Sequence, residues 1–182
     1  SSATSARSTG SLGFRSPRAT GIPSPRSPGC WAIVTDETRV TDILQDFPIL
    51  VTPNRVFDGV SQPALLDQWW TLRSSGRPTV GATYELDFGP NYLWRAVVTA
   101  SRPGAAFELR LTDADRDWKD TVVGFDLSAS GTGTHVRFYH RGWPEPNEHY
   151  RTSCHCWALY LRLLRRYLER GETVPYADRL DA

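Results

Sequence analysis

The chain has 182 residues, a net charge of +1, and charged and apolar fractions that are ordinary for a soluble globular protein. The charge is uneven, because residues 1–29 carry four arginines and no acid, which leaves 17 basic and 20 acidic residues in the remainder. That remainder lacks the excess of basic residues that nucleic-acid binding favours, so we expect no nucleic-acid partner. No apolar run approaches the 18 or so residues of a membrane helix, so we also expect no membrane insertion.

The cysteine content indicates a reducing environment. The chain has three cysteines, Cys30, Cys154 and Cys156, and their small, odd number without framework spacing favours free thiols and a cytoplasmic protein. Cys154 and Cys156 flank His155, which suggests a metal site. On a helix, however, residues two apart point to nearly opposite sides, and no second Cys or His pair follows at a zinc spacing. We therefore expect no metal ion and no other cofactor.

The beginning of the chain differs from the rest in composition. Residues 1–29 are rich in Ser, Pro, Gly and Arg and contain few large apolar side chains. Such a segment cannot bury enough surface to offset the entropy lost on ordering, so we predict a disordered tail followed by one domain over residues 30–182. Two alternatives stay open, an organellar transit peptide and a translation start assigned too far upstream.

The domain begins with extended segments and a short helix. Residues 40–45 and 47–51 are the expected extended pieces, and Pro48 excludes an uninterrupted central strand there. A short helix is predicted next, because Thr52 is a candidate N-cap and Pro53 suits the first helical position.

A second short helix is expected over residues 61–70, and after it apolar and polar residues alternate in five runs separated by turn residues. These runs cover residues 83–88, 92–101, 106–112, 121–128 and 134–141. A period of two with one charged face predicts antiparallel strands in a sheet that is wet on one side and covered on the other. The predicted covered face carries Tyr84, Leu86, Phe88, Trp94, Ala96, Val98, Phe107, Leu109, Leu111, Val123, Phe125, Leu127, Val136, Phe138 and His140.

The last long segment, residues 149–170, has a strong helical period. Apolar residues recur at three- and four-residue steps and form one stripe of Cys154, Trp157, Leu161, Leu164 and Leu168. Gly171 follows as a stop in the left-handed conformation. At about 1.5 Å per residue this helix spans roughly 33 Å and needs a broad apolar surface to lie on. We therefore predict an α+β fold in which a curved antiparallel sheet surrounds a long C-terminal helix.

Three segments resemble one known family. Residues 54–70, NRVFDGVSQPALLDQWW, look like the opening VF-x-A-x-x-x-P-x-x-L-x-x-WW of the SRPBCC superfamily, especially of its branch homologous to the activator of the heat-shock-protein-90 ATPase. Residues 131–143, GTGTHVRFYHRGW, resemble that branch's G-T-x-V-x-x-x-H-x-G strand. Residues 156–171, CWALYLRLLRRYLERG, resemble its ending GW-x-x-x-L-x-x-L-x-x-Y-L-E-x-G. The resemblance covers about residues 45–172 and implies the helix-grip fold, also called START-like or Bet v 1-like.

One position departs from the family pattern. Cys156 stands where that branch usually has Gly before the Trp. The larger side chain either pushes the helix slightly off the sheet or narrows the space between them.

Members of this superfamily bind hydrophobic ligands between the sheet and the helix, and some act on polyketides as cyclases or aromatases. The resemblance therefore implies a protein that binds a small apolar or aromatic molecule, including lipids. The predicted ligand-binding residues are Tyr84, Leu86, Trp94, Phe107, Leu109, Phe125, Phe138, His140, Trp157 and Leu161. Two alternatives stay open, a cyclase-type enzyme that uses the same cavity and an interaction module for a chaperone. The chain is expected to be a monomer or a homodimer.

His140 is the candidate general acid or base, because it is predicted to point inward and histidine titrates near neutral pH. In the alternative interpretation it is hydrogen-bonded to the backbone at the strand end and holds the turn to Gly142 and Trp143. The aromatic walls are also compatible with a closed core that has no room for a ligand. Trp118 covers the rim of the cavity or packs on the sheet edge, and the sequence leaves both open.

Overall fold

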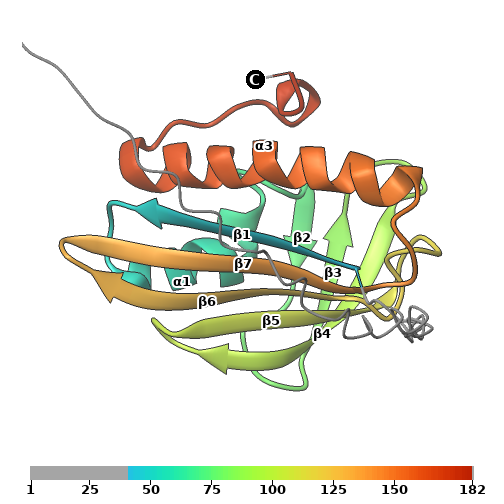
Figure 1. Ribbon diagram of the computed structural model, residues 1–182, viewed down its shortest axis with the longest axis horizontal. Coiled ribbons are helices and arrows are strands. Elements are labelled where there is room, and N and C mark those ends of the chain that lie inside the picture. The colour runs from blue at the N-terminus through green and yellow to red at the C-terminus, as the bar shows by residue number, and fades with distance from the viewer. Residues whose placement is uncertain (1–40, 182) are drawn as a thin grey trace, which may run out of the picture. The chain divides into compact units, whose positions relative to one another are not determined.

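The structure, a computed structural model, describes residues 41–181. The predicted tail at residues 1–29 and the predicted domain start at residue 30 lie outside these residues. The described part of the chain contains a seven-stranded antiparallel sheet in the order β1-β7-β6-β5-β4-β3-β2, and one long helix, α3, runs across one face of it (Figure 1). This arrangement is the helix-grip fold that the sequence predicts.

The strands are β1 (Thr41–Ile49), β2 (Arg73–Ser75), β3 (Thr83–Asp87), β4 (Leu93–Arg102), β5 (Ala106–Asp113), β6 (Val122–Ser130) and β7 (Gly133–Trp143). The five alternating runs are thus β3 to β7, with ends that differ by at most two residues. β1 is one continuous strand rather than two pieces, and it tolerates Pro48 because, among the described residues, it is an edge strand that pairs with β7 alone. The sequence did not predict β2, which is too short to show a period.

The helices are α1 (Pro53–Ser61), α2 (Pro63–Leu66), α3 (Glu148–Arg170) and the 3₁₀ turn η1 (Tyr176–Asp178). Thr52 caps α1 as predicted, since its side chain accepts a hydrogen bond from the Arg55 N–H. The expected helix over residues 61–70 is shorter than predicted, because α2 spans only one turn. The η1 turn was not predicted.

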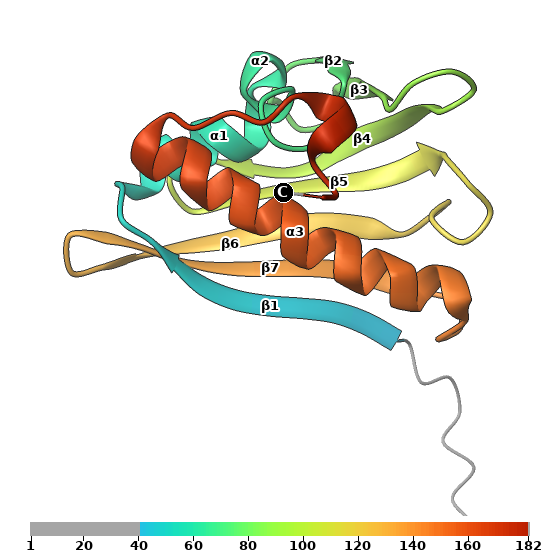
Figure 2. The same cartoon turned by 90° about the horizontal axis from the view of Figure 1, so that it is seen from above.

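Helix α3 has defined ends and one buried stripe. The Asn147 side chain accepts a hydrogen bond from the Tyr150 N–H at 2.9 Å, and Gly171 ends the helix with φ of 71°. In the predicted stripe, Trp157, Leu161, Leu164 and Leu168 are buried and Cys154 is half-buried. Figure 2 shows α3 lying over the sheet, with α1 and α2 beside it over the same face.

The apolar face of the sheet is covered as predicted, except at one end. Thirteen of the fifteen side chains expected on this face are buried, and only Phe88 and Trp94 are half-buried. These two rings lie 4.9 Å apart between centroids, Trp94 on β4 and Phe88 in the turn that connects β3 to β4. The covered face is therefore incompletely closed at this end of the sheet.

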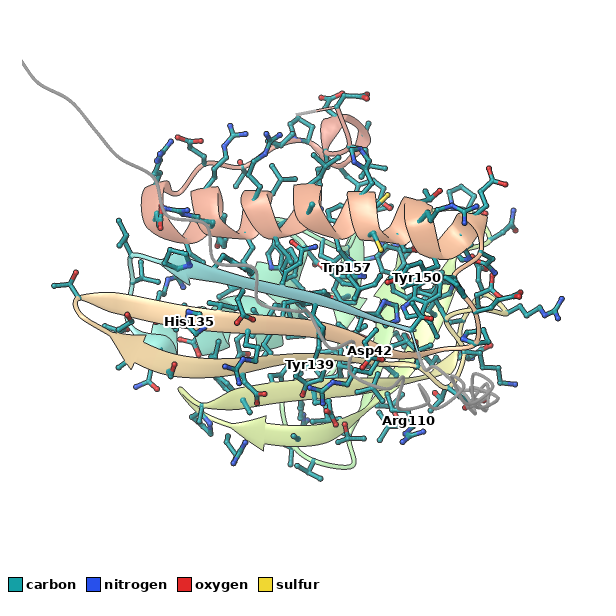
Figure 3. The ribbon with its side chains drawn as sticks, viewed as in Figure 1. Asp42, Arg110, His135, Tyr139, Tyr150 and Trp157 are labelled. Atoms are coloured by element: carbon teal, nitrogen blue, oxygen red, sulfur yellow. The ribbon has the colours of Figure 1, made fainter. Side chains whose placement is uncertain are left out.

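The opposite face of the sheet has a tyrosine packed on a glycine. Tyr139 on β7 pairs with Gly124 on β6, and its ring occupies the space that a Cβ atom at Gly124 would need. The Tyr139 hydroxyl donates to Glu108 Oε2 at 2.8 Å, and the Arg141 guanidinium lies 3.8 Å from the centre of the Tyr139 ring. Figure 3 labels Tyr139 on the side of the sheet away from α3. These contacts hold the ring flat over the glycine.

We predict that Gly124→Ala destabilises the protein by about 1–3 kcal/mol, because the new methyl group displaces the Tyr139 ring and breaks its bond to Glu108. Urea unfolding followed by tryptophan fluorescence measures this change. In a Tyr139→Ala background the same substitution should be neutral or stabilising, since glycine is itself unfavourable within a strand. An equal loss in both backgrounds would contradict the packing explanation.

Candidate functional site

His140 on β7 is fully buried and has a partner for each ring nitrogen. Its Nδ1 accepts a hydrogen bond from the Trp157 indole N–H at 3.1 Å, so Nδ1 carries no proton. Nε2 therefore carries the hydrogen and donates to Thr121 Oγ1 at 2.9 Å. The Thr121 hydroxyl in turn donates to the Trp118 carbonyl oxygen. This chain of hydrogen bonds links α3 to β7 and to the segment before β6.

Aromatic rings surround the imidazole. The centroids of Trp118, Trp143 and Trp157 lie 4.4, 4.8 and 6.0 Å from that of His140. Burial lowers the pKa of His140 to about 3, with a smaller contribution from His149. The ring is therefore neutral near pH 7, and its partners are side chains rather than the backbone. Both ring nitrogens are engaged in hydrogen bonds within the protein, so neither is free to exchange a proton with a ligand in this arrangement. The role of His140 as a general acid or base stays a prediction.

A layer of rings extends from this network toward the open end of the sheet. Trp157 stacks on Trp118 with centroids 5.8 Å apart and lies 5.2 Å from Trp70. Trp118 lies 4.8 Å from Trp94, and Trp70 lies 5.5 Å from Phe88. Trp157 comes from the side of α3 that faces the sheet (Figure 3). The layer separates the closed core from a cavity.

The cavity has a volume of about 440 Å³ and walls from five separate segments of the chain. Its aromatic lining consists of Trp70, Phe88, Tyr92, Trp94, Trp118, Tyr160 and Tyr176. Its polar lining consists of Asp115, His149, Thr152, Ser153 and Cys156. Leu180 completes the wall. We call this cavity the aromatic pocket.

The ten predicted ligand-binding residues lie in three environments. Trp94 lines the aromatic pocket, and Leu161 lines a smaller groove of about 220 Å³ beside β1 and α3. The remaining eight are at most 4% exposed and belong to the core or its edge: Tyr84, Leu86, Phe107, Leu109, Phe125, Phe138, His140 and Trp157. Within this group, Trp157 contacts three rings of the pocket wall, those of Trp70, Trp118 and Tyr160. The assignment of these residues to ligand binding stays a prediction.

The sequence did not point to the C-terminal wall of the pocket. Tyr176 and Leu180 follow α3 in a segment without periodicity. The Tyr176 hydroxyl donates to the Phe88 carbonyl at 2.8 Å. The Arg179 guanidinium, which is buried, donates to the carbonyl oxygens of residues 67, 71 and 174 at 2.6–3.1 Å. These polar contacts fold the segment back against the sheet. Tyr160 could have been predicted, since it lies one helical turn after Trp157.

Trp118 lies at the pocket, as the first of its two predicted positions describes, and not on an edge strand, because His140 belongs to the inner strand β7. It lines the aromatic pocket, and it also packs on the His140 ring. Its indole N–H donates to Ser153 Oγ on α3 at 3.3 Å. The loop that carries Trp118 is therefore tied to the helix across the pocket wall.

A carboxylate orients the histidine of the pocket. Asp117 Oδ2 accepts hydrogen bonds from Asn147 Nδ2 at 3.1 Å and from His149 Nδ1 at 3.2 Å. The hydrogen bond from Asn147 is the largest cause that holds the pKa of Asp117 below its usual range, and the hydrogen bond from His149 is the next largest. Because a carboxylate only accepts, His149 Nδ1 carries the hydrogen of this bond.

Two groups that line the pocket, the Cys156 thiol and the Tyr160 hydroxyl, are uncharged near pH 7. Burial raises the pKa of the Cys156 thiol, and it raises the pKa of Tyr160 to about 12. Cys156 lines the pocket, and the narrowing of this space by its side chain stays a prediction. Cys154 packs instead against the core. Within residues 41–181 no three His, Cys, Asp or Glu side chains are grouped so that they could hold a metal ion.

We predict that His140 causes a loss of stability of about 1.4 kcal/mol per pH unit as the pH falls below about 6. Stability falls with falling pH because the pKa of His140 is lower in the folded chain than in the unfolded chain. Between these two pKa values the unfolded chain binds a proton that the folded chain does not bind. Urea unfolding of wild type and His140→Gln between pH 7 and 4.5 measures this slope. The variant should be less stable at pH 7 by about 1–3 kcal/mol and should lose the slope.

His135→Gln is the matched control, since His135 is partly exposed beside Asp46. It should keep the wild-type pH dependence. A slope that persists in His140→Gln would show that another group is responsible.

Comparison with known proteins bears on the identity of the chain. The family described as Activator of Hsp90 ATPase homolog 1-like protein matches residues 50–169. No curated protein sequence matches the chain. A similar solved structure is that of the Aha1 dimer from Colwellia psychrerythraea, which is 26% identical, has a TM-score of 0.66, and is matched over 72% of this chain and 98% of that chain.

Two more distant structures share the fold. A protein from Mesorhizobium loti is 23% identical, with a TM-score of 0.62 over 72% of this chain and 99% of that chain. DynU16, described as a protein in the dynemicin biosynthetic locus, is 20% identical, with a TM-score of 0.64 over 74% of this chain and 50% of that chain.

The family match confirms the resemblance noted in the sequence. The matched region begins at residue 50, directly after β1, and ends at residue 169, one residue before the end of α3. It thus includes the two short helices, strands β2 to β7 and almost all of α3. Because this region is well over half of the 182 residues, the chain belongs to the family of Activator of Hsp90 ATPase homolog 1-like proteins.

Proposed function

We propose that this protein binds a small apolar or aromatic molecule in the aromatic pocket. The observation that carries the proposal is the cavity of about 440 Å³, because seven aromatic side chains and few polar groups line it. Ligand sites in proteins are typically concave and mostly apolar, with a small number of polar groups that orient the ligand. Binding energy would come mainly from apolar surface removed from water.

The cellular setting we propose is the cytoplasm. Cys154 and Cys156 are free thiols, which supports a reducing compartment. Within residues 41–181, no helix has both the length and the apolar character needed to cross a membrane.

Two other functions have weaker support. A cyclase-type enzyme would need a free acid or base, and the two nitrogens of His140 are already bonded to Trp157 and Thr121. An interaction with a chaperone is supported only by the family description, and pull-down with the chaperone, with and without ATP, tests it.

A homodimer is supported only by the similar Aha1 dimer, and analytical sedimentation tests it.

A neutral probe with a naphthalene ring tests the proposed function. We expect 2-(1-naphthyl)ethanol to bind with a Kd near 1 mM or below, since about 0.3 kcal/mol per non-hydrogen atom gives roughly 4 kcal/mol for a probe of this size. Ligand-observed NMR measures the affinity. Native mass spectrometry of the protein from its own host would then identify a natural ligand that co-purifies.

Filling the pocket should abolish this binding. Cys156→Phe places a ring into the cavity and should weaken probe binding at least about tenfold, because the wall rings are too closely packed to move aside. His155→Phe is the matched control, since it adds the same ring on the exposed side of α3. Probe binding that is equal in both variants, or absent in the wild type, would contradict the proposed function.

A further inference from the structure

The charged groups of the aromatic pocket are not balanced. Its lining contains one carboxylate, that of Asp115, and no lysine or arginine. Within residues 41–181 the Asp115 side chain makes no hydrogen bond or ion pair, although its carbonyl accepts from the N–H groups of Trp118 and Lys119. The Asp115 carboxylate therefore has no ion-pair partner among the residues that the structure describes.

Two other polar groups of the lining already use a hydrogen within the protein. His149 donates from Nδ1 to Asp117, so this hydrogen is not available to a ligand. The Tyr176 hydroxyl uses its hydrogen on the Phe88 carbonyl, which leaves its oxygen as an acceptor. The Asp115 carboxylate and the Tyr176 oxygen therefore suit a ligand that donates hydrogen bonds.

The aromatic lining favours the same kind of ligand. Three tryptophans, three tyrosines and one phenylalanine line the cavity. Aromatic rings attract cations through their quadrupole, with tryptophan the strongest, and clusters of such rings bind ammonium groups. An anionic ligand would find no lysine or arginine in the lining.

We propose that the ligand of the aromatic pocket is an aromatic or apolar molecule that carries a protonated amine. The ammonium group donates to the Asp115 carboxylate, and the apolar body fills the space between the rings. This inference rests on the proposed function, because it names the ligand class of the same pocket.

Two positive features near the pocket are already compensated. Arg179 lies behind the wall, 5.3 Å from the centre of the Tyr176 ring, but its guanidinium is bonded to three backbone carbonyls and does not line the cavity. The positive end of α3 carries Glu148 in its first turn and is capped by Asn147. Neither feature supplies a free cation at the pocket surface.

Three probes with the same ring system test the charge preference: 2-(1-naphthyl)ethylamine, 2-(1-naphthyl)ethanol and 1-naphthaleneacetate. Ligand-observed NMR at pH 7 measures the three affinities. The amine should bind about fivefold to thirtyfold tighter than the alcohol, and the acetate should bind most weakly. Equal affinities for amine and alcohol, or tightest binding of the acetate, would overturn the inference and leave the proposed function standing. Absence of binding for all three would overturn both.

Two variants of the same loop locate the charge that is recognised. Asp115→Asn should remove most of the amine's advantage while leaving the affinity for the alcohol within about twofold. Asp120→Asn is the matched control, because it removes one negative charge from an exposed residue outside the pocket. Asparagine also tolerates the positive φ of 66° at residue 120. A loss of preference in both variants would indicate a long-range charge effect and overturn the role of Asp115.

Discussion

The hydrogen bond from the Trp157 indole to His140 Nδ1 fixes the position of the long helix on the sheet. Apolar contacts alone allow a helix to slide or rotate over a broad surface, since they are non-directional. Leaving a buried N–H or a buried imidazole nitrogen without a hydrogen-bond partner costs about 1–3 kcal/mol of folding free energy for each group. The two groups meet only when Trp157 stands above the end of β7, so this contact selects one helix placement among many.

That placement decides where the molecule is closed and where it is open. Over strands β5 to β7 the apolar face is closed, because Phe138 lies 4.6 Å from Trp157 of α3, Phe107 lies 6.1 Å from Phe57 of α1, and Phe125 lies 6.3 Å from Trp69, measured between ring centroids. Toward Phe88 and Trp94 the sheet extends beyond the cover of the helix, and the returning C-terminal segment covers the gap only in part. The aromatic pocket is the space that remains between the sheet, α3 and the returning C-terminal segment, and Trp70 and the loop that carries Asp115 and Trp118 complete its walls.

The strands and α3 could be predicted from the sequence because each has one wet face and one buried face. The alternation at residues 106–112 or the stripe around Leu161 reports that difference directly. The three residues of β2 and the single turn of α2 are too short to show any period. The pocket could not be predicted, because Trp70, Asp115, His149 and Tyr176 come from segments far apart in the chain. Inward direction on the sheet predicts burial, and burial alone does not distinguish a packed core from a cavity wall.

The pocket remains open because its rings are held by polar contacts as well as by packing. Trp118 is bonded to Ser153, Trp157 to His140, and the Tyr176 hydroxyl to the Phe88 carbonyl. Moving any of these rings into the cavity would break a partly or fully buried hydrogen bond, and the apolar packing formed in exchange would have to outweigh that loss. These bonds hold the walls in place without a ligand. The proposed ligand would not have to order them, so more of the energy of burying its apolar surface would be available for affinity.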